Sequence, residues 1–278
     1  MARYGGRLAR RLGMRPVLLH AGEVAAPTRT ADEERMIAGV AARQGLDAAE
    51  LVTVQGAPVA ALAALSEEAD TGAIVVGSRG HGALRSLLVG SVAWQLAREA
   101  ACPVVLAPLD TGESLTDERT VLCALDDDED VEEAARLSTA IAARMRAQLV
   151  LAHVAPTDAP AEVPAEGVVE APEVLAELEH GRRVLDRALA AADTVTGAES
   201  LVRTIRLDHG PAGPGIERLA YEERADLVVV GTPRRSRLGA ALLGSAFEEL
   251  RRGRRFGLVV CPARRPLPAA PPLADASS

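Results

Sequence analysis

Three glycines and a serine within fifteen residues carry the clearest chemical signal in this sequence. Gly77 and Gly80 are followed, after nine residues, by Gly90 and Ser91. Gly77 ends an apolar run typical of a buried strand, and the segment from Ser91 has the periodicity of a helix. Glycines let backbone N–H groups approach an anion, and the N–H groups and dipole at a helix start favour phosphate. The spacing predicts a phosphate-binding loop; the alternative is an ordinary strand-to-helix loop that Ser91 caps.

The residues inside this loop add positive charge, because Arg79, His81 and Arg85 lie between its two ends. Guanidinium and imidazolium groups form charge-assisted hydrogen bonds to phosphate oxygens. We therefore include Arg79 and His81 with the glycines and Ser91 in the candidate binding site.

The pattern occurs a second time, with the same spacing between its members, at Gly231, Gly244 and Ser245. A simple turn has no reason to keep such spacing, so the repetition favours a binding role. The second loop is degenerate, since Arg234 stands at the position of the second glycine and Pro233 lacks an N–H group. Ser245 also fits a helix capping box without any ligand.

An acidic run follows the first predicted strand of the second copy. Asp126 comes directly after Val121–Leu125, and residues 127–130 are all acidic. Such a run would repel a polyphosphate and is typical of a helix N-terminus. His20 and His153 end matching strands, where they have either a structural role or a place near a bound nucleoside. We assign no catalytic residue and no metal ligand, since no histidine has a partner at metal-ligand spacing.

Composition excludes several kinds of protein. The chain has 278 residues, of which 48% are hydrophobic and 2% aromatic, and its net charge is −8. The acidic excess and the scarcity of aromatic rings argue against nucleic-acid binding. There is no lysine, which excludes a Walker A loop, a Schiff-base enzyme and a protein kinase.

Cysteine usage and hydropathy indicate a cytoplasmic protein. Cys102, Cys123 and Cys261 are widely separated, so we expect buried, reduced thiols. No apolar run approaches the roughly 18 residues of a membrane span, and the N-terminus lacks a signal-peptide hydrophobic region.

Alternating apolar runs and helical segments predict an α/β fold in which two tandem domains each contain a doubly wound, Rossmann-like parallel sheet. In the second copy we expect five strands, listed with the intervening helices: strand 121–125, helix 131–146, strand 149–154, helix 172–192, strand 201–207, helix 215–223, strand 227–230, helix 245–252 and strand 258–260.

The first copy is expected to begin late. Its strand Val17–His20 matches Val150–His153, and the same alignment would put the partner of Asp126 before Met1. The first strand and half of the first helix are therefore missing from this sequence. Because that strand is interior in a doubly wound sheet, we expect the natural protein to carry upstream residues that form it.

The expected organisation has four parts: a truncated domain over 1–108, a linker over 109–119, a domain with a degenerate glycine loop over 120–265, and a disordered tail over 266–278. We expect the last strands, Val104–Leu106 and Leu258–Val260, to pair with each other, because either edge alone would be prone to aggregation.

The sequence resembles the universal stress protein family in its tandem two-domain form. The family pattern of G-x-x-G, nine residues, then G and Ser or Thr is matched in full by Gly77, Gly80, Gly90 and Ser91. Pro16–His20 and residues 148–154 look like the family's second strand, and residues 101–106 look like its last strand. The resemblance spans nearly the whole chain.

This resemblance implies an adenine nucleotide alpha hydrolase-like fold that binds ATP, or AMP or ADP. It also allows Mg²⁺ to bind together with the nucleotide. It implies a role in stress physiology and dimerisation through edge strands. In a tandem protein the two copies can pair with each other in this way and form a pseudo-dimer within one chain. A further homodimer stays open. Asp126 matches the family's nucleoside-contacting acid. No protein partner is indicated.

We expect a regulatory nucleotide sensor, not a turnover enzyme, with the first copy as the better binding site. Two alternatives stay open. One is a nucleotide-free interaction module that acts through its pseudo-dimer surface, favoured because neither copy is complete. The other is a slow ATPase. This alternative is disfavoured because no general base and no metal-binding carboxylate is assigned beside the complete loop.

Overall fold

The computed structural model places elements of both copies. It describes residues 2–22, 35, 39, 42, 50–77, 91–108, 119–126, 131–155, 172–231, 256–261 and 267. The helix expected over 245–252, the linker from 109 to 118 and the tail after 267 lie outside the described residues.

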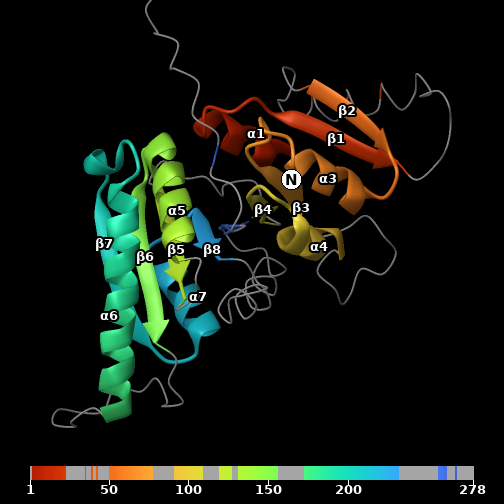
Figure 1. The fold of residues 1–278 in the computed structure, drawn as a ribbon. Helices are drawn as coiled ribbons and strands as arrows, with labels where there is room; N and C mark the ends of the chain where they lie inside the picture. Colours follow the sequence, from red (N-terminus) through yellow and green to blue (C-terminus); the bar gives the residue numbers. More distant parts are fainter. Residues whose placement is uncertain are drawn as a thin grey trace, which may run out of the picture.

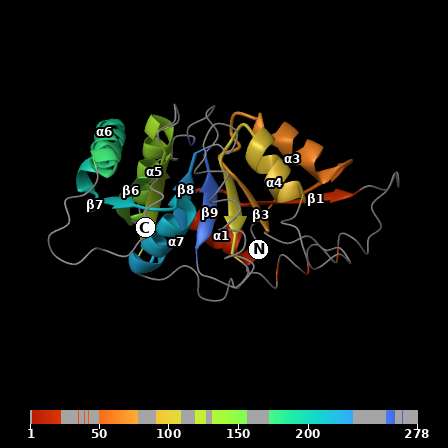
Figure 2. The same ribbon diagram turned by 90° about the horizontal axis from the view of Figure 1, so that it is seen from below.

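Seven strands form one sheet in the order β3-β4-β9-β8-β5-β6-β7. The first copy supplies β3 (Ile74–Gly77) and β4 (Val104–Ala107). The second copy supplies β5 (Thr120–Leu125), β6 (Gln148–Ala155), β7 (Arg203–His209), β8 (Leu227–Val230) and β9 (Gly257–Val260). A separate two-stranded parallel sheet contains β1 (Val17–Gly22) and β2 (Glu50–Gln55). β7, at one edge of the large sheet, lies far from β1 of the small sheet (Figures 1 and 2).

Helices cover both faces of the large sheet. They are α1 (Ala2–Arg11), α3 (Pro58–Ser66), α4 (Ser91–Glu99), α5 (Val131–Met145), α6 (Pro172–Asp193) and α7 (Ala212–Glu222), with a 3₁₀ turn at Ala198–Ser200. Within the described residues, none of these helices combines the length and the hydropathy that a bilayer span requires.

The second copy has the doubly wound topology that the sequence predicts. All neighbouring strands from β9 to β7 are parallel, and their spatial order has the first strand of the copy, β5, at its centre. β5 lies between β6 and β8 and is buried along its whole length. The α/β fold class is confirmed.

The two copies join through their last strands, as predicted. β4 pairs with β9 in antiparallel register, with Val104 opposite Val260 and Leu106 opposite Leu258. This pairing makes one continuous sheet from strands of both copies. Because the junction is antiparallel, the carboxyl ends of β3 and β4 face the opposite edge of the sheet from those of β5 and β8.

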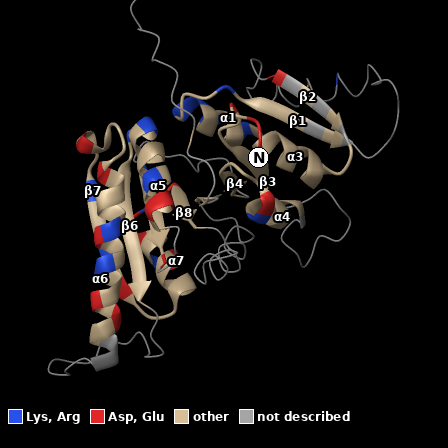
Figure 3. Cartoon of the chain, in the orientation of Figure 1, with Lys and Arg blue, Asp and Glu red and all other residues tan. Residues whose placement is uncertain are grey.

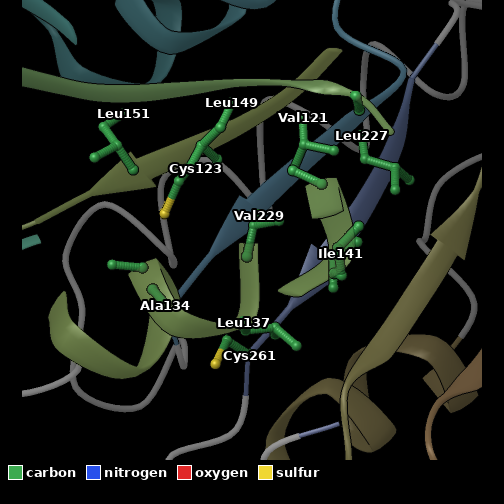
Figure 4. Packing of buried hydrophobic residues seen from close by; sticks show 14 of the residues in the cluster. Val121, Cys123, Ala134, Leu137, Ile141, Leu149, Leu151, Leu227, Val229 and Cys261 are labelled. Atoms are coloured by element: carbon green, nitrogen blue, oxygen red, sulfur yellow. The ribbon is translucent and has the colours of Figure 1, made fainter. Parts of the chain in front are cut away.

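Strand residues alternate between two hydrophobic cores, one on each face of the sheet. Leu122 and Val150 belong to the core that also contains residues of α4 and α7, whereas Val121 and Leu149 belong to the core that contains residues of α1, α5 and α6. The second core is shown in Figure 4, where residues of α5 lie over the strands. Charged residues gather on the outward sides of α5 and α6 (Figure 3). The three cysteines are buried thiols and form no disulfide, which confirms the predicted burial.

Backbone φ angles agree between matched positions of the two copies, which confirms the repeat. Gly56 and Gly210, which are partners in the alignment of the two glycine loops, have φ values of 118° and 120°. Gly13 and Arg146, which are partners in the alignment of His20 with His153, have φ values of 67° and 52°. Each of these last two residues ends a helix with the same pair of hydrogen bonds, as in a Schellman motif.

Two predicted elements in the second copy begin at least two residues away from their predicted starts. α7 begins at Ala212 instead of Gly215, because Pro214 lies in the first turn, where a helix needs no N–H from it. β7 begins at Arg203 instead of Leu201, because the N–H of Leu201 donates to the carbonyl of Ala198 and closes the 3₁₀ turn.

Candidate functional site

The two ends of the glycine loop, residues 77–91, are both placed. Gly77 is the last residue of β3, where it lies opposite Ala107 of β4. Ser91 is the first residue of α4, although its side chain is not described. Arg79, Gly80, His81 and Gly90 lie outside the described residues. The predicted strand-to-helix connection is therefore confirmed at its two ends.

In the second copy, Asp126 and Gly231 come together. Asp126 directly follows β5 and Gly231 directly follows β8, and these strands are parallel neighbours with Ala124 opposite Val230. Both residues are partly buried. Gly244 and Ser245 lie outside the described residues.

This pair lies where the winding of the second copy reverses. The first two crossovers, through α5 and α6, cover one face of the sheet, and α7 covers the other. In open α/β sheets the crevice at such a reversal, beyond the carboxyl ends of the strands, is where ligands bind. Asp126 and Gly231 thus flank the position expected for a ligand of the second copy.

The candidate residues divide into two separate sites. β4 and β9 are antiparallel, so the carboxyl end of β3 and the carboxyl end of β5 lie at opposite edges of the sheet. Gly77 and Asp126 therefore cannot contact one small ligand. The glycine loop of the first copy has to work without the acid of the second.

The side chain of His153 is buried and contacts the backbone at the end of β5. Its side chain is 2% exposed, and Nδ1 lies 3.0 Å from the carbonyl oxygen of Leu125. As the neutral tautomer with a proton on Nδ1, the ring donates to that oxygen and positions the residue before Asp126. α6 passes directly over the ring, since a Cβ on Gly181 would lie 2.5 Å from its Cδ2 atom. The His20 side chain is not described.

A buried pair of polar residues was not found from the sequence. Asp226 is 3% exposed, and its Oδ2 atom accepts a hydrogen bond of 3.3 Å from the N–H of Thr120. Burial raises the pKa of the Tyr4 hydroxyl, and the charge of Asp226 raises it further. These groups lie at the amino ends of β5 and β8, the edge away from Asp126 and Gly231, so we assign them to packing.

No group of three or more potential metal ligands occurs among the residues that the structure describes. The acidic run at residues 127–130 lies outside them.

The fold and the strand-end glycines define a class of doubly wound α/β protein with a repeated loop at the carboxyl edge. The sequence profile of the Universal stress protein family matches residues 1–108 and again residues 118–254. The chain belongs to this family of stress-response proteins, and it contains the tandem form of its domain.

Individual relatives agree with this assignment. A universal stress protein encoded in the QAH/OAS sulfhydrylase 3′ region of Thermus aquaticus is 38% identical over 86 residues, which cover 30% of this chain and 61% of that protein. The match thus spans less than two thirds of the curated relative.

Solved structures share the whole fold. A universal stress protein from Archaeoglobus fulgidus DSM 4304 superposes with a TM-score of 0.57 at 18% identity and covers 94% of this chain and 90% of its own. A putative universal stress protein from Pseudomonas aeruginosa UCBPP-PA14 gives 0.55 at 19% identity, with coverages of 92% and 86%.

Proposed function

We propose that this protein is a stress-response regulator that binds ATP, or ADP or AMP, through the glycine loop of its first copy. The observation that supports the proposal is the placement of the two residues at the ends of the loop: β3 ends at Gly77 and α4 begins at Ser91. A loop between the carboxyl end of a parallel strand and a helix N-terminus presents backbone N–H groups to an anion.

The donor set suits a polyphosphate. Glycines at 77, 80 and 90 have no Cβ that could block an anion from their backbone N–H groups, the sequence has a hydroxyl at Ser91, and Arg79 and Arg85 carry positive charge. Mg²⁺ would accompany the phosphates as their counter-ion. The adenine nucleotide supplies the negative charge, and this chain's own residues bind and orient it.

The second copy is the weaker candidate. Gly231 is followed by Thr232, Pro233 and Arg234, which reduces the number of N–H groups available to an anion. Asp126 next to Gly231 adds a negative charge at the same edge. Phosphate binding there is disfavoured by both features.

We propose sensing and not turnover because the glycine loop and Asp126 lie at opposite edges of the sheet. A carboxylate that activates water or holds Mg²⁺ has to lie within hydrogen-bond reach of the reacting phosphate. Asp126 cannot reach the first copy's loop, so slow hydrolysis would need another acid.

The test compares two matched variants of the full chain. Gly90→Asp places a carboxylate and a Cβ at the phosphate position of the first copy, and we expect it to abolish binding of a fluorescent ATP analogue. Gly244→Asp makes the same change in the second copy and should alter the affinity less than twofold. Equal losses in both variants would contradict the assignment to the first copy.

Two further measurements complete the test. Chromatography of nucleotide released from the purified, denatured protein should show ATP, ADP or AMP near one equivalent per chain. Phosphate release from ATP should stay at background; a steady release that Gly90→Asp removes would indicate the slow ATPase instead.

A further inference from the structure

β7 is an edge strand of the large sheet with exposed apolar side chains (Figure 1). Within the part of the chain that the structure describes, β7 pairs with β6 on one side and with no strand on the other. The side chains of Ile205 and Leu207 are 47% and 38% exposed. An open strand edge that carries such residues is a template for pairing with another strand.

The backbone groups on the open side of β7 can be identified. The N–H of Leu149 in β6 donates to the carbonyl of Val202, so the groups of Val202 face β6. By the alternation of a strand, the N–H and C=O groups of Ile205 and Leu207 point away from β6. The N–H of His209 also lies on that side, but it donates to the carboxylate of the preceding residue at 2.8 Å. Ile205 and Leu207 therefore present the donors for a new ladder.

The face of β7 toward α6 is apolar. α6 crosses above β6 and β7, since a Cβ on Gly181 would lie 2.5 Å from the His153 ring and 2.7 Å from Leu207 Cδ1. The helix does not cover the edge completely, because Ile205 and Leu207 stay exposed beside it. A second strand along this edge would bury both side chains further.

The face of β7 toward α7 carries two opposite charges. Arg206 donates from Nε to Glu223 at 2.6 Å, and Asp208 accepts from Arg218. Arg206 and Asp208 both remain partly exposed in these ion pairs. They are two residues apart, so a strand that pairs with β7 has to present the complementary charges at the same spacing.

β7 itself has this complementary pattern. In an antiparallel pair with its two-fold axis at Leu207, Arg206 lies opposite Asp208 of the partner subunit, and the same contact occurs twice. An axis at Arg206 or at Asp208 would place like charges opposite each other. Opposite charges across two strands are stabilising and like charges are destabilising. The charges thus favour the register centred on Leu207.

The strand β2, in the small sheet, is a poorer partner for this edge. Val52 and Val54 stand in β2 at the repeat positions of Arg206 and Asp208, so β2 offers no charge to either. A contact between β7 and β2 would also join unlike surfaces, which leaves a further β7 and a further β2 free in every pair of chains. Pairing of β7 with itself closes at two chains.

We propose that the protein forms a homodimer in which β7 pairs in antiparallel register with β7 of a second chain, centred on Leu207. Main-chain hydrogen bonds over residues 205–209, apolar contacts of Ile205 and Leu207 beside α6, and two ion pairs between Arg206 and Asp208 of the partner subunit form the interface. The two large sheets become one. This proposal does not depend on nucleotide binding.

The first experiment changes the charges and measures association of the full chain by sedimentation equilibrium. Arg206→Glu and Asp208→Lys each place like charges opposite each other twice, so each should weaken the homodimer at least about tenfold. In an equimolar mixture of the two variants, the substituted side chains lie opposite each other and so do the native ones. We expect this heterodimer to form within about threefold of the native affinity.

Two results of this experiment would overturn the proposal. One is a native chain that remains a monomer up to about 100 μM, which is well above the dissociation constants of stable dimers. The other is a mixture that associates no better than each variant alone.

The second experiment removes a backbone donor from the open edge. Ile205→Pro deletes an N–H that points away from β6, so the fold should persist by circular dichroism while the dimer is lost. The matched control, Ile205→Thr, keeps the N–H and a β-branched side chain and should weaken association less. A folded Ile205→Pro variant that dimerises as the native chain does would contradict pairing through this edge.

Hydrogen exchange locates the interface. We expect the amides of Ile205 and Leu207 to exchange at least about tenfold more slowly at concentrations where the dimer forms than in the dilute monomer, while those of β2 keep their rates. Concentration-dependent protection of β2 without protection of β7 would show that the chains associate through a different strand.

Discussion

Tyr4 connects α1 to strands of the second copy. It is 1% exposed, and a Cβ built on Gly257 of β9 would lie 2.1 Å from its hydroxyl oxygen. Among the described residues, that hydroxyl has no hydrogen-bond partner. A buried hydroxyl without a partner is destabilising, because it loses its hydrogen bonds to water. Glycine at 257 is what allows the ring to approach β9.

The first residue-scale prediction concerns this contact. Gly257→Ala should lower the free energy of unfolding by about 2 kcal/mol, because the new methyl group displaces the ring. Tyr4→Phe should be neutral or stabilising by up to about 1 kcal/mol. In the Tyr4→Phe background Gly257→Ala should cost less, as measured by a double-mutant cycle in urea.

The control for this cycle is Tyr221→Phe, at a tyrosine that is 71% exposed. We expect its effect to stay within about 0.5 kcal/mol and to be additive with Gly257→Ala. If the effects of Tyr4→Phe and Gly257→Ala on the free energy of unfolding were additive, the contact between the two residues would contribute nothing to stability.

Sequence reasoning at this scale identified residues by type and spacing but not by partner. Repeat spacing and strand ends are visible in a sequence, which is why Gly77, Asp126 and Gly231 could be selected as candidates and placed at strand ends. Sequence reasoning left the role of His153 open, since the bond to Leu125 and the approach of Gly181 depend on how α6 packs. Asp226 was missed because its partner, Thr120, lies far away in the sequence.

At the scale of elements, a side-chain pair links α5 to α6. Arg187 donates to both carboxylate oxygens of Glu132, at 2.9 and 3.2 Å. These hydrogen bonds hold the pKa of the Glu132 carboxyl below its usual range. Because the folded-state pKa is lowered, the stabilisation is fully present above the ordinary value near 4.5 and is lost as the pH falls through the folded value.

Arg187→Gln should therefore destabilise the protein at pH 7 by less than about 1 kcal/mol, since both side chains are partly exposed. The difference from the unaltered chain should shrink as the pH falls below the ordinary glutamate value. Urea unfolding at several pH values measures it, and Arg182→Gln on the same helix is the control. A difference that is constant with pH would contradict the role of Glu132.

Most elements were predictable because their signals are local. The strands at 74–77, 104–107 and 227–230 are short apolar runs bounded by Gly or Pro, and α5 and α6 have clear helical periodicity. The start of α7 was predicted too late because Pro214 and Gly213 read as breakers, although a first turn tolerates both. The arrangement of β1 and β2 as a separate sheet is set by long-range pairing.

At the scale of the whole molecule, the antiparallel junction decides how the two candidate sites relate. It places the glycine loop of the first copy and the Asp126–Gly231 pair at opposite edges of one sheet. Any communication between the sites through the sheet has to pass through β4 and β9, which pair through Val104, Val105 and Leu106. The junction itself was predictable, because both last strands are apolar and would otherwise be exposed edges.

Because β4 and β9 belong to one chain, the stability of their pairing does not depend on protein concentration. Two separate chains that met through such strands would dissociate on dilution, and their thermal midpoint would fall with protein concentration. Here both strands belong to one chain, so in the Ile205→Pro variant, which should not dimerise through β7, the midpoint should be the same at about 1 μM as at about 100 μM, as measured by circular dichroism. A midpoint that rises with concentration in this variant would reveal a homodimer that forms through another surface. With a constant midpoint, the protein keeps its paired sheet even at the lowest cellular abundance.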